Sequence, residues 1–163
     1  MRRPKIILAL MLLFQISATA APLDQIEFGI ATAPAQVEDG LDDIWSDWAN
    51  QGKIAGFKET PMANDRLRFF TDPDPEINAV SESGVGVYRL GLDWGRIMPE
   101  ENRFDEVAIA RDKGLIRKIR VRKLKIMLTL MHHSVPKWAQ ARGGWLVDSM
   151  KDQFSGFQQT PHR

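Results

Sequence analysis

The stretch KIMLTLMHHSVPKWAQARGGW, residues 125–145, decides the fold. Its apolar run at 126–131 ends abruptly in His132 and His133, and Ser134 follows them. A short apolar run with polar groups gathered at its carboxyl end is typical of a fully buried strand in a parallel sheet. In (β/α)8 barrels the carboxyl ends of the strands hold the active site. We therefore expect functional groups at His132 and His133.

Two further strands are expected before this stretch. FGIATA at 28–33 predicts a short buried strand, and 85–94 predicts a second strand. Apolar spacing predicts helices at 42–50, 106–124 and 147–157, and a further helix at 74–83 that Asp74 is expected to cap. With a third strand at 125–132, strands alternate with helices, and this order predicts a parallel α/β fold.

Composition limits the function classes. The chain has 163 residues, a formal net charge of +1 and no Cys, which excludes disulfides and thiol catalysis. The segment 111–125 carries eight basic residues, and it could form an anionic-membrane or nucleic-acid patch. Its apolar residues fall at helical spacing, so the solvated face of a helix is the favoured interpretation. We expect no nucleic-acid partner, no metal and no cofactor.

The N-terminus carries the pattern of a secretory signal peptide. Arg2, Arg3 and Lys5 precede an apolar run at 6–14, and small residues including Ala18-Thr19-Ala20 follow. This pattern predicts export, with cleavage near Ala20. Residues 1–20 would then be the signal peptide and 21–163 a single partial barrel domain. The alternative is an uncleaved anchor, which would associate the chain with a membrane through its N-terminus.

Three predicted strand ends together resemble a known family. The motifs are ATAPAQVEDG (31–40), GVYRLGLDWGRIMPE (86–100) and LTLMHHSVPKWAQARGGW (128–145). In order and spacing they resemble the first three strand regions of glycoside hydrolase family 1, the β-glucosidase family. His133 and Asp93 stand where most of that family has Trp and Ser. These departures resemble the sensitive-to-freezing branch, which includes galactolipid galactosyltransferases, although Gln36 stands where its plant members tend to have His.

The resemblance implies a fold and a reaction. The fold would be the N-terminal part, about three βα units, of a (β/α)8 TIM barrel. The reaction would be retaining cleavage of a β-glycoside or glycolipid, with transfer to water or another sugar. By resemblance Gln36, His132 and His133 bind the substrate, and Arg89 would orient the nucleophilic carboxylate. The branch resemblance suggests the chloroplast outer envelope as an alternative to export.

Each of these residues also has a structural interpretation. The amide of Gln36 suits sugar hydroxyls but also suits a loop hydrogen bond, and His132 could be a core histidine. A buried Arg89 needs an anionic partner, and Asp93 is the local alternative to a nucleophile. On a strand, His132 and His133 would point to opposite faces, so they would not chelate one metal.

Other polar and aromatic residues are expected to be structural. Glu38 and Asp39 are adjacent, so their side chains diverge, and the resemblance gives Glu38 a structural role. Four residues are expected to pack at strand ends: Trp94, Arg96, Trp138 and Trp145. Of these, Trp145 is expected to reach the rim of the site.

The two catalytic carboxylates of the family are not found in this sequence. The resemblance places them in a T-x-N-E-P motif and a T-E-N-G-type motif, and neither occurs among the 163 residues. We therefore expect an N-terminal fragment that is inactive alone. The alternatives from other classes are a non-catalytic sugar-binding module and a membrane-surface α/β module.

Overall fold

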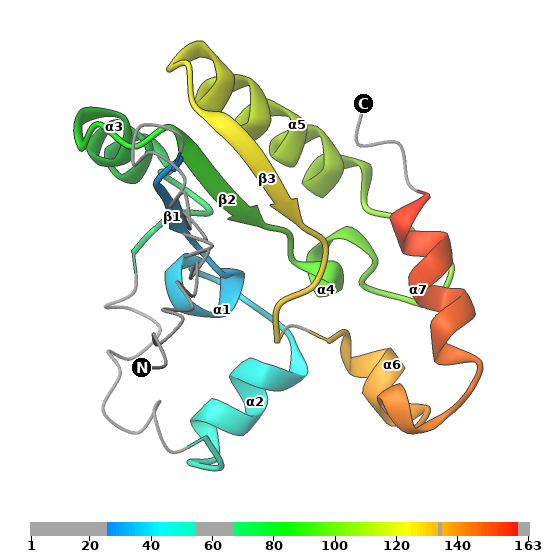
Figure 1. Cartoon of the computed structure of the whole chain (residues 1–163). Helices are drawn as coiled ribbons and strands as arrows, with labels where there is room; N and C mark the ends of the chain where they lie inside the picture. The colour runs from blue at the N-terminus through cyan, green and yellow to red at the C-terminus, as the bar shows by residue number, and fades with distance from the viewer. Residues whose placement is uncertain (1–25, 55–66, 134, 160–163) are drawn as a thin grey trace, which may run out of the picture.

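The computed structural model describes residues 26–54, 67–133 and 135–159 (Figure 1). Three strands form its sheet: β1 (Gly29–Ala31), β2 (Val87–Gly91) and β3 (Lys125–Thr129). The helices are α1 (Pro34–Val37), α2 (Ile44–Asn50), α3 (Asp74–Glu82), α4 (Trp94–Ile97), α5 (Glu106–Val121), α6 (Lys137–Ala141) and α7 (Met150–Gln158), with a 3-10 helix, η3, at Gly144–Leu146. The predicted signal peptide, 1–20, lies outside the described residues.

The sheet is parallel, with the strand order β1-β2-β3. Ile30 of β1 is in register with Tyr88 of β2, and Tyr88 is in register with Ile126 of β3. Helices α3 and α5 lie on the chain between successive strands, and Figure 1 shows α5 running alongside β3. This arrangement confirms the predicted parallel α/β pattern, and it brings the carboxyl ends of all three strands to one edge of the sheet.

An apolar core joins one face of the sheet to the helices. Tyr88 and Leu90 of β2 are buried against side chains of α3 and α5, among them Ile77 and Ile119. Because side chains alternate along a strand, Arg89 points away from this core. The core therefore holds the sheet and leaves Arg89 on the opposite face.

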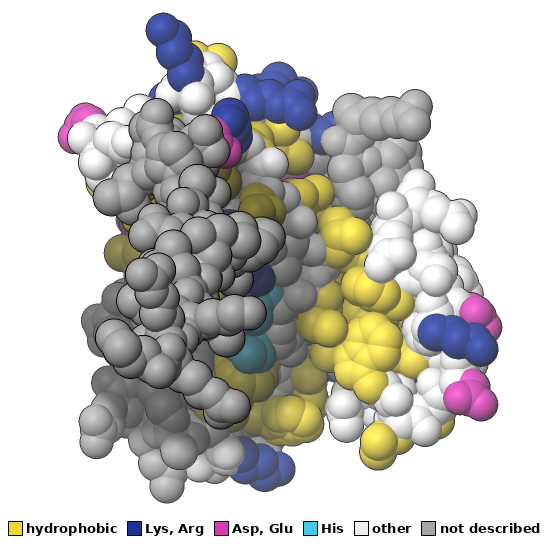
Figure 2. All heavy atoms as spheres, in the orientation of Figure 1, with side chains coloured by type: hydrophobic (Ala, Val, Ile, Leu, Met, Phe, Trp, Pro, Cys, Tyr) yellow, Lys and Arg dark blue, Asp and Glu magenta, His cyan; other side chains and the backbone are white. Residues whose placement is uncertain are grey.

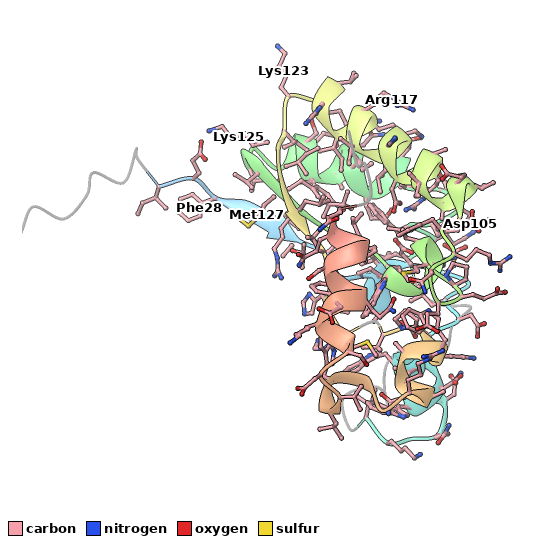
Figure 3. The ribbon with its side chains drawn as sticks, turned by 90° about the vertical axis from the view of Figure 1, so that its right-hand side faces the viewer. Phe28, Asp105, Arg117, Lys123, Lys125 and Met127 are labelled. Carbon is pink, nitrogen blue, oxygen red and sulfur yellow. The ribbon has the colours of Figure 1, made fainter. Side chains whose placement is uncertain are left out.

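The prediction that the first and third strands are buried is wrong. Phe28 beside β1 is 66% exposed, and Met127 of β3 is 57% exposed. Among the described residues β1 and β3 are the edges of the sheet, and only β2 has a neighbour on both sides. Phe28 and Met127 are labelled in Figure 3, where both belong to the sheet end of the molecule.

A second apolar core lies beyond the carboxyl ends of the strands. Trp94 is fully buried at its centre, and its ring contacts Trp138 at 5.8 Å and Phe154 at 5.2 Å between centroids. Trp145 contacts Trp94 as well, at 5.9 Å, and remains 47% exposed. The predicted packing roles of these tryptophans are therefore confirmed.

Several basic residues of the segment 111–125 form ion pairs. Lys118 and Arg122 on or next to α5 pair with Asp74 of α3, and Lys125 pairs with Glu27. Arg117 and Lys123 project outward in Figure 3. This mixture of surface pairs and outward cations fits the favoured interpretation of a solvated helix face.

The expected cap of α3 is wrong. Asp74 is the first residue of the helix, not the residue before it, and its side chain pairs with Lys118 and Arg122 instead of capping the helix. Acidic caps do occur elsewhere: Asp105 accepts hydrogen bonds from the amides of Val107 at 2.8 Å and Ala108 at 3.0 Å. Pro73 occupies the cap position of α3 and has no side-chain acceptor.

The described helices are too short or too polar to span a bilayer. None of them, over 26–54, 67–133 and 135–159, is both long enough and apolar enough to cross a membrane.

Two residues on α5 test the packing of the sheet core. Ile119 is fully buried, whereas Val121, two positions further, is 79% exposed. We expect Ile119→Ala to lower the free energy of unfolding by about 2–5 kcal/mol, because it removes buried methyl groups and leaves a cavity. Val121→Ala is the matched control and should change it by less than about 0.5 kcal/mol. Urea unfolding of both variants checks this, and equal effects would contradict the assigned core.

Candidate functional site

The predicted site residues follow or occupy the carboxyl ends of the three strands. Gln36 is exposed on α1, directly after β1, and Arg89 lies in β2. His132 and His133 follow β3. Since the strands are parallel, Gln36, His132 and His133 belong to the same end of the sheet, whereas Arg89 is the third of the five residues of β2.

Arg89 is held by the neighbouring strand. Its Nε donates a hydrogen bond to Oγ1 of Thr129 at 2.8 Å, from β2 to β3. Asp93, the local partner considered from the sequence, is buried and accepts from the amide of Arg96 at 2.6 Å, so it caps α4. Arg89 is half-buried, and the contact with Thr129 restricts the direction of its guanidinium on the face away from the helices.

The expected geometry of the two histidines is wrong. They were placed on a strand with opposite directions, but β3 ends at Thr129, before either of them. His133 has a φ of 69°, in the left-handed region, and this turn brings the two imidazole rings together, with centroids 4.4 Å apart. The argument from opposite faces against a shared metal therefore fails. Within the described ranges, no group of three or more His, Asp or Glu side chains is placed to hold a metal ion.

Burial lowers the pKa of His132 below its ordinary value of 6.5, and the neighbouring His133 and Arg89 lower it further. A neutral imidazole offers one N–H donor and one nitrogen acceptor. His132 therefore suits a hydroxyl group, which also donates and accepts.

Both histidines line a pocket of about 440 Å³. The other lining residues are mostly apolar or aromatic: Ile44, Trp45, Trp48, Met131, Val135, Gln140 and Trp145. Figure 2 shows the histidine side chains in cyan beside a hydrophobic surface. Trp145 reaches the rim, as predicted. Trp45 and Trp48 were not singled out as site residues, although their spacing of three on a predicted helix was a usable signal that they share a face.

A larger pocket of about 500 Å³ contains none of the four predicted residues. Gly40, Phe70, Arg96, Arg111 and Lys137 are among the residues that line it. Its two arginines are already engaged in the network described next. We therefore assign the candidate site to the smaller pocket, where the histidines lie.

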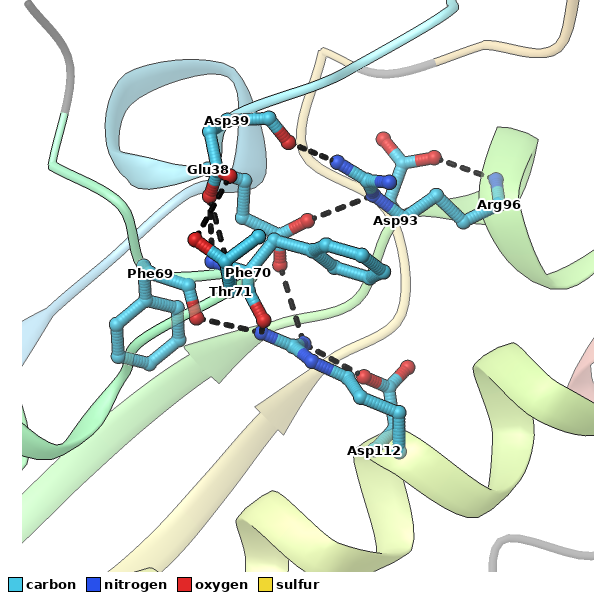
Figure 4. A network of polar contacts seen from close by, with 9 residues as sticks. Glu38, Asp39, Phe69, Phe70, Thr71, Asp93, Arg96 and Asp112 are labelled. Atoms are coloured by element: carbon cyan, nitrogen blue, oxygen red, sulfur yellow. Dashed lines mark hydrogen bonds and ion pairs between the residues drawn. The ribbon is translucent and has the colours of Figure 1, made fainter.

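A buried carboxylate stabilises the chain beside the site (Figure 4). Glu38 is 3% exposed and pairs with Arg96 of α4 at 3.0 Å and with Arg111 of α5 at 3.5 Å. Arg111 also donates to the carbonyl oxygen of Phe69 at 2.6 Å. Asp39, next to Glu38, accepts from the amide of Phe70 at 3.0 Å. Glu38 thus has a structural role, and Arg96 is an ion-pair residue in addition to the packing residue that was predicted.

Burial has the largest effect on the pKa of Glu38. Desolvation raises the pKa of this carboxyl from 4.5 to about 7, although Arg111 and Arg96 act to lower it. The pKa of Asp39 moves the other way, because backbone hydrogen bonds and the Thr71 side chain outweigh a raising effect of burial. The two adjacent carboxyls therefore differ in ionisation and do not form a matched pair.

Comparison with known proteins places these features in a family. Residues 21–162 match the model of "Glycosyl hydrolase family 1". A galactolipid galactosyltransferase SFR2 described as chloroplastic, from Arabidopsis thaliana, is 32% identical over 185 residues, covering 80% of this chain and 30% of the relative. A β-glucosidase-like SFR2, also described as chloroplastic, from Oryza sativa subsp. japonica, is 38% identical over 110 residues, covering 64% of this chain and 17% of the relative.

A solved structure gives the same result for the fold. The crystal structure of the family 1 β-glucosidase from Exiguobacterium antarcticum B7 has a TM-score of 0.73 and 26% identity, covering 80% of this chain and 30% of that one. The fold and the family match thus place the chain in a family of glycosidases and transglycosidases. The chain belongs to glycosyl hydrolase family 1, and within it to the SFR2-like branch. It spans about a third or less of the length of these relatives.

The shifted carboxyl of Glu38 predicts a pH dependence of stability. Its folded pKa of about 7 is above the unfolded value of 4.5, so its favourable contribution is complete below 4.5 and is lost as the pH rises through 7. We expect the free energy of unfolding of the intact chain to fall over this window relative to that of Glu38→Gln, which cannot ionise. Urea unfolding at closely spaced pH values, with the two proteins compared at each pH, measures this difference.

The direction of the pH effect on stability distinguishes Glu38 from Asp39 and His132. Asp39 has a lowered pKa, so its contribution is lost only as the pH falls below 3.8. The lowered pKa of His132 makes stability fall as the pH drops below 6.5, opposite to Glu38. A difference between the two proteins that stays constant from pH 4 to pH 9 would refute the buried-carboxyl interpretation.

Proposed function

We propose that this chain forms the sugar-binding part of a retaining β-glycosidase or transglycosidase and has no hydrolytic activity alone. The observation that carries the proposal is the histidine pair, which follows β3 and lines an aromatic pocket, in a chain of family 1 whose parallel sheet also places Gln36 directly after β1 and Arg89 in β2. Gln36, His132 and His133 would hold hydroxyl groups of the sugar. Their neutral amide and imidazole groups both donate and accept hydrogen bonds, as hydroxyl groups require.

Arg89 would act on a carboxylate. A guanidinium keeps a nearby carboxylate ionised and orients it with directed N–H donors. The contact with Thr129 supports this role, because it positions Arg89 on the face away from the helical core. The proposed partner is the nucleophile of the retaining reaction, which attacks the sugar while a second carboxyl group protonates the leaving oxygen.

The chemistry itself needs two carboxyl groups about 5–5.5 Å apart. Neither of the two family motifs that would hold them occurs in the 163 residues. Glu38 is buried between two arginines, and Asp39 is tied to the amides of Phe70 and Thr71. Neither residue is free to serve as the missing pair, so the proposal assigns binding to this chain and not bond cleavage.

The substrate class follows from the relatives as a proposal. The Arabidopsis relative is named a galactolipid galactosyltransferase, and other relatives are named β-glucosidases. We propose a β-glycoside or a galactolipid, with water or a second sugar as acceptor. Gln36 departs from the plant members of the branch, so the identity of the sugar is a separate question for binding experiments.

Location is proposed on separate grounds. The first 20 residues predict export, and the two SFR2 relatives are described as chloroplastic. We propose export through the N-terminal signal, with an uncleaved anchor at the chloroplast envelope as the alternative. Sequencing the N-terminus of the mature protein decides between them, because cleavage near Ala20 supports only the first.

A non-catalytic sugar-binding module is the second candidate. The pocket with two histidines and three tryptophans is present without a catalytic pair, and that observation favours it. Both candidates predict sugar binding. They differ in whether a longer polypeptide with the two carboxylate motifs accompanies this chain in the cell.

The purified intact chain should not hydrolyse 4-nitrophenyl β-D-galactopyranoside or the matching glucoside. The reason is that, among the described residues, no Asp or Glu lines the candidate pocket to stabilise the transition state. Release of nitrophenol is followed by absorbance, with an intact family 1 β-glucosidase as the positive control. Turnover above the buffer blank that survives repurification would contradict the proposal.

Sugar binding should depend on His132. We expect His132→Ala to weaken binding of methyl β-D-galactopyranoside or its gluco isomer by about 3–10-fold, the effect of losing a neutral hydrogen bond. Saturation-transfer NMR titration measures the affinity. Val121→Ala, at an exposed position of α5, is the control and should bind like the unmodified chain. Unchanged affinity in His132→Ala would remove His132 from the site.

A further inference from the structure

Three aromatic rings from two distant parts of the chain form a continuous stack beside the pocket. Trp45 of α2 stacks on His133, with centroids 4.2 Å apart and planes inclined by 18°. His133 in turn contacts His132, with centroids 4.4 Å apart and planes inclined by 43°. We call these residues the ring stack. It connects a helix that follows β1 to the histidine pair that follows β3.

The ring stack contains a strained residue. His133 has a φ of 69° and is not a glycine, so its backbone lies in a sparsely populated region. Such a conformation is unfavourable, and surrounding contacts must maintain it. An aromatic pair contributes stability beyond the burial of its rings. Stacking on Trp45 therefore offsets part of the strain.

The strained turn determines where His132 points. In an extended chain the rings of His132 and His133 would lie on opposite sides. The left-handed turn places them side by side, in the wall of one pocket. If His133 relaxed to an extended conformation, the two rings would separate and His132 would leave its present direction.

We propose that Trp45 is a positioning residue for His132. By stacking on His133 it maintains the left-handed turn after β3, and through that turn it orients the His132 ring in the pocket. The sugar-binding consequence of this inference rests on the proposed function. The orientation itself does not, because it can be measured without any ligand.

The surroundings of His132 provide a direct readout. The charged and titratable groups that act on it are His133, its neighbour in the chain, and Arg89 from β2. Together with burial they hold its pKa below 6.5. If the ring stack opens, His132 becomes more exposed and moves away from these groups, so its pKa should rise towards the ordinary value.

The experiment compares three variants of the intact chain: Trp45→Leu, Trp45→Phe and Trp48→Leu. Leu removes the aromatic ring, and Phe keeps one. Trp48 is the matched control, since it lies one turn further on α2 and lines the same pocket, and the described structure gives it no ring contact with His133. The readouts are the NMR titration of the His132 imidazole protons and the affinity for methyl β-D-galactopyranoside.

Trp45→Leu should raise the pKa of His132 and weaken sugar binding by about 5–10-fold. Trp45→Phe should restore both quantities close to those of the unmodified chain, and Trp48→Leu should leave the pKa of His132 unchanged. An unchanged His132 pKa in Trp45→Leu would overturn the inference, as would an equal change in Trp48→Leu. A merely structural role of Trp45 would not give this pattern of loss and rescue.

The experiment distinguishes a failure of the proposed function from a failure of the inference about Trp45. If the unmodified chain binds no sugar, the proposed function fails, and the His132 titrations still decide the role of Trp45. If Trp45→Leu does not fold, as judged by circular dichroism, the unmodified chain must still show nuclear Overhauser contacts between the Trp45 indole and the His133 ring. Their absence would overturn the inference.

Discussion

The contacts of one buried carboxyl group with two arginines connect the segments on which the candidate site depends. Glu38 directly follows α1, two residues after Gln36, and its carboxyl group contacts arginines of α4 and α5. Removing the Glu38 carboxyl group would leave the polar groups of both arginines without one of their partners. Through Glu38, the turn after β1 is therefore connected both to α4, which follows β2, and to α5, which precedes β3.

Local patterns in the sequence were sufficient for the order of strands and helices and for the residues at the strand ends. The run at 126–131 followed by His132 identified the third strand, because both the periodicity and the polar end are contiguous in the chain. Parallel pairing then places Gln36 and His132, which follow β1 and β3, at one end of the sheet without further information. This placement follows from topology alone.

The parts that could not be predicted depend on contacts between distant residues. Glu38 and Arg111 are 73 positions apart, and nothing local to Glu38 specifies that partner. The direction of His133 depends on a positive φ next to Trp45, which a rule for extended strands cannot anticipate. The predicted burial of the first and third strands is wrong for a related reason. Burial of a strand depends on neighbours on both sides, and β1 and β3 are the edge strands of the described sheet.

The separation of binding from chemistry has a structural basis in parallel barrels. Each strand end contributes a few side chains to a shared site, and the catalytic residues come from several different strands. A chain that covers 30% of a family 1 β-glucosidase therefore contains some of these contributions in full and others not at all. The histidine pair, Arg89 and Gln36 are complete local features, each held by contacts or by short turns within this chain. A catalytic carboxyl pair cannot be formed within one strand end, because two different strands must bring the two carboxyl groups to the same sugar. The proposed binding groups can thus be oriented by contacts within this chain, whereas the proposed bond cleavage depends on carboxyl groups that different strands bring together.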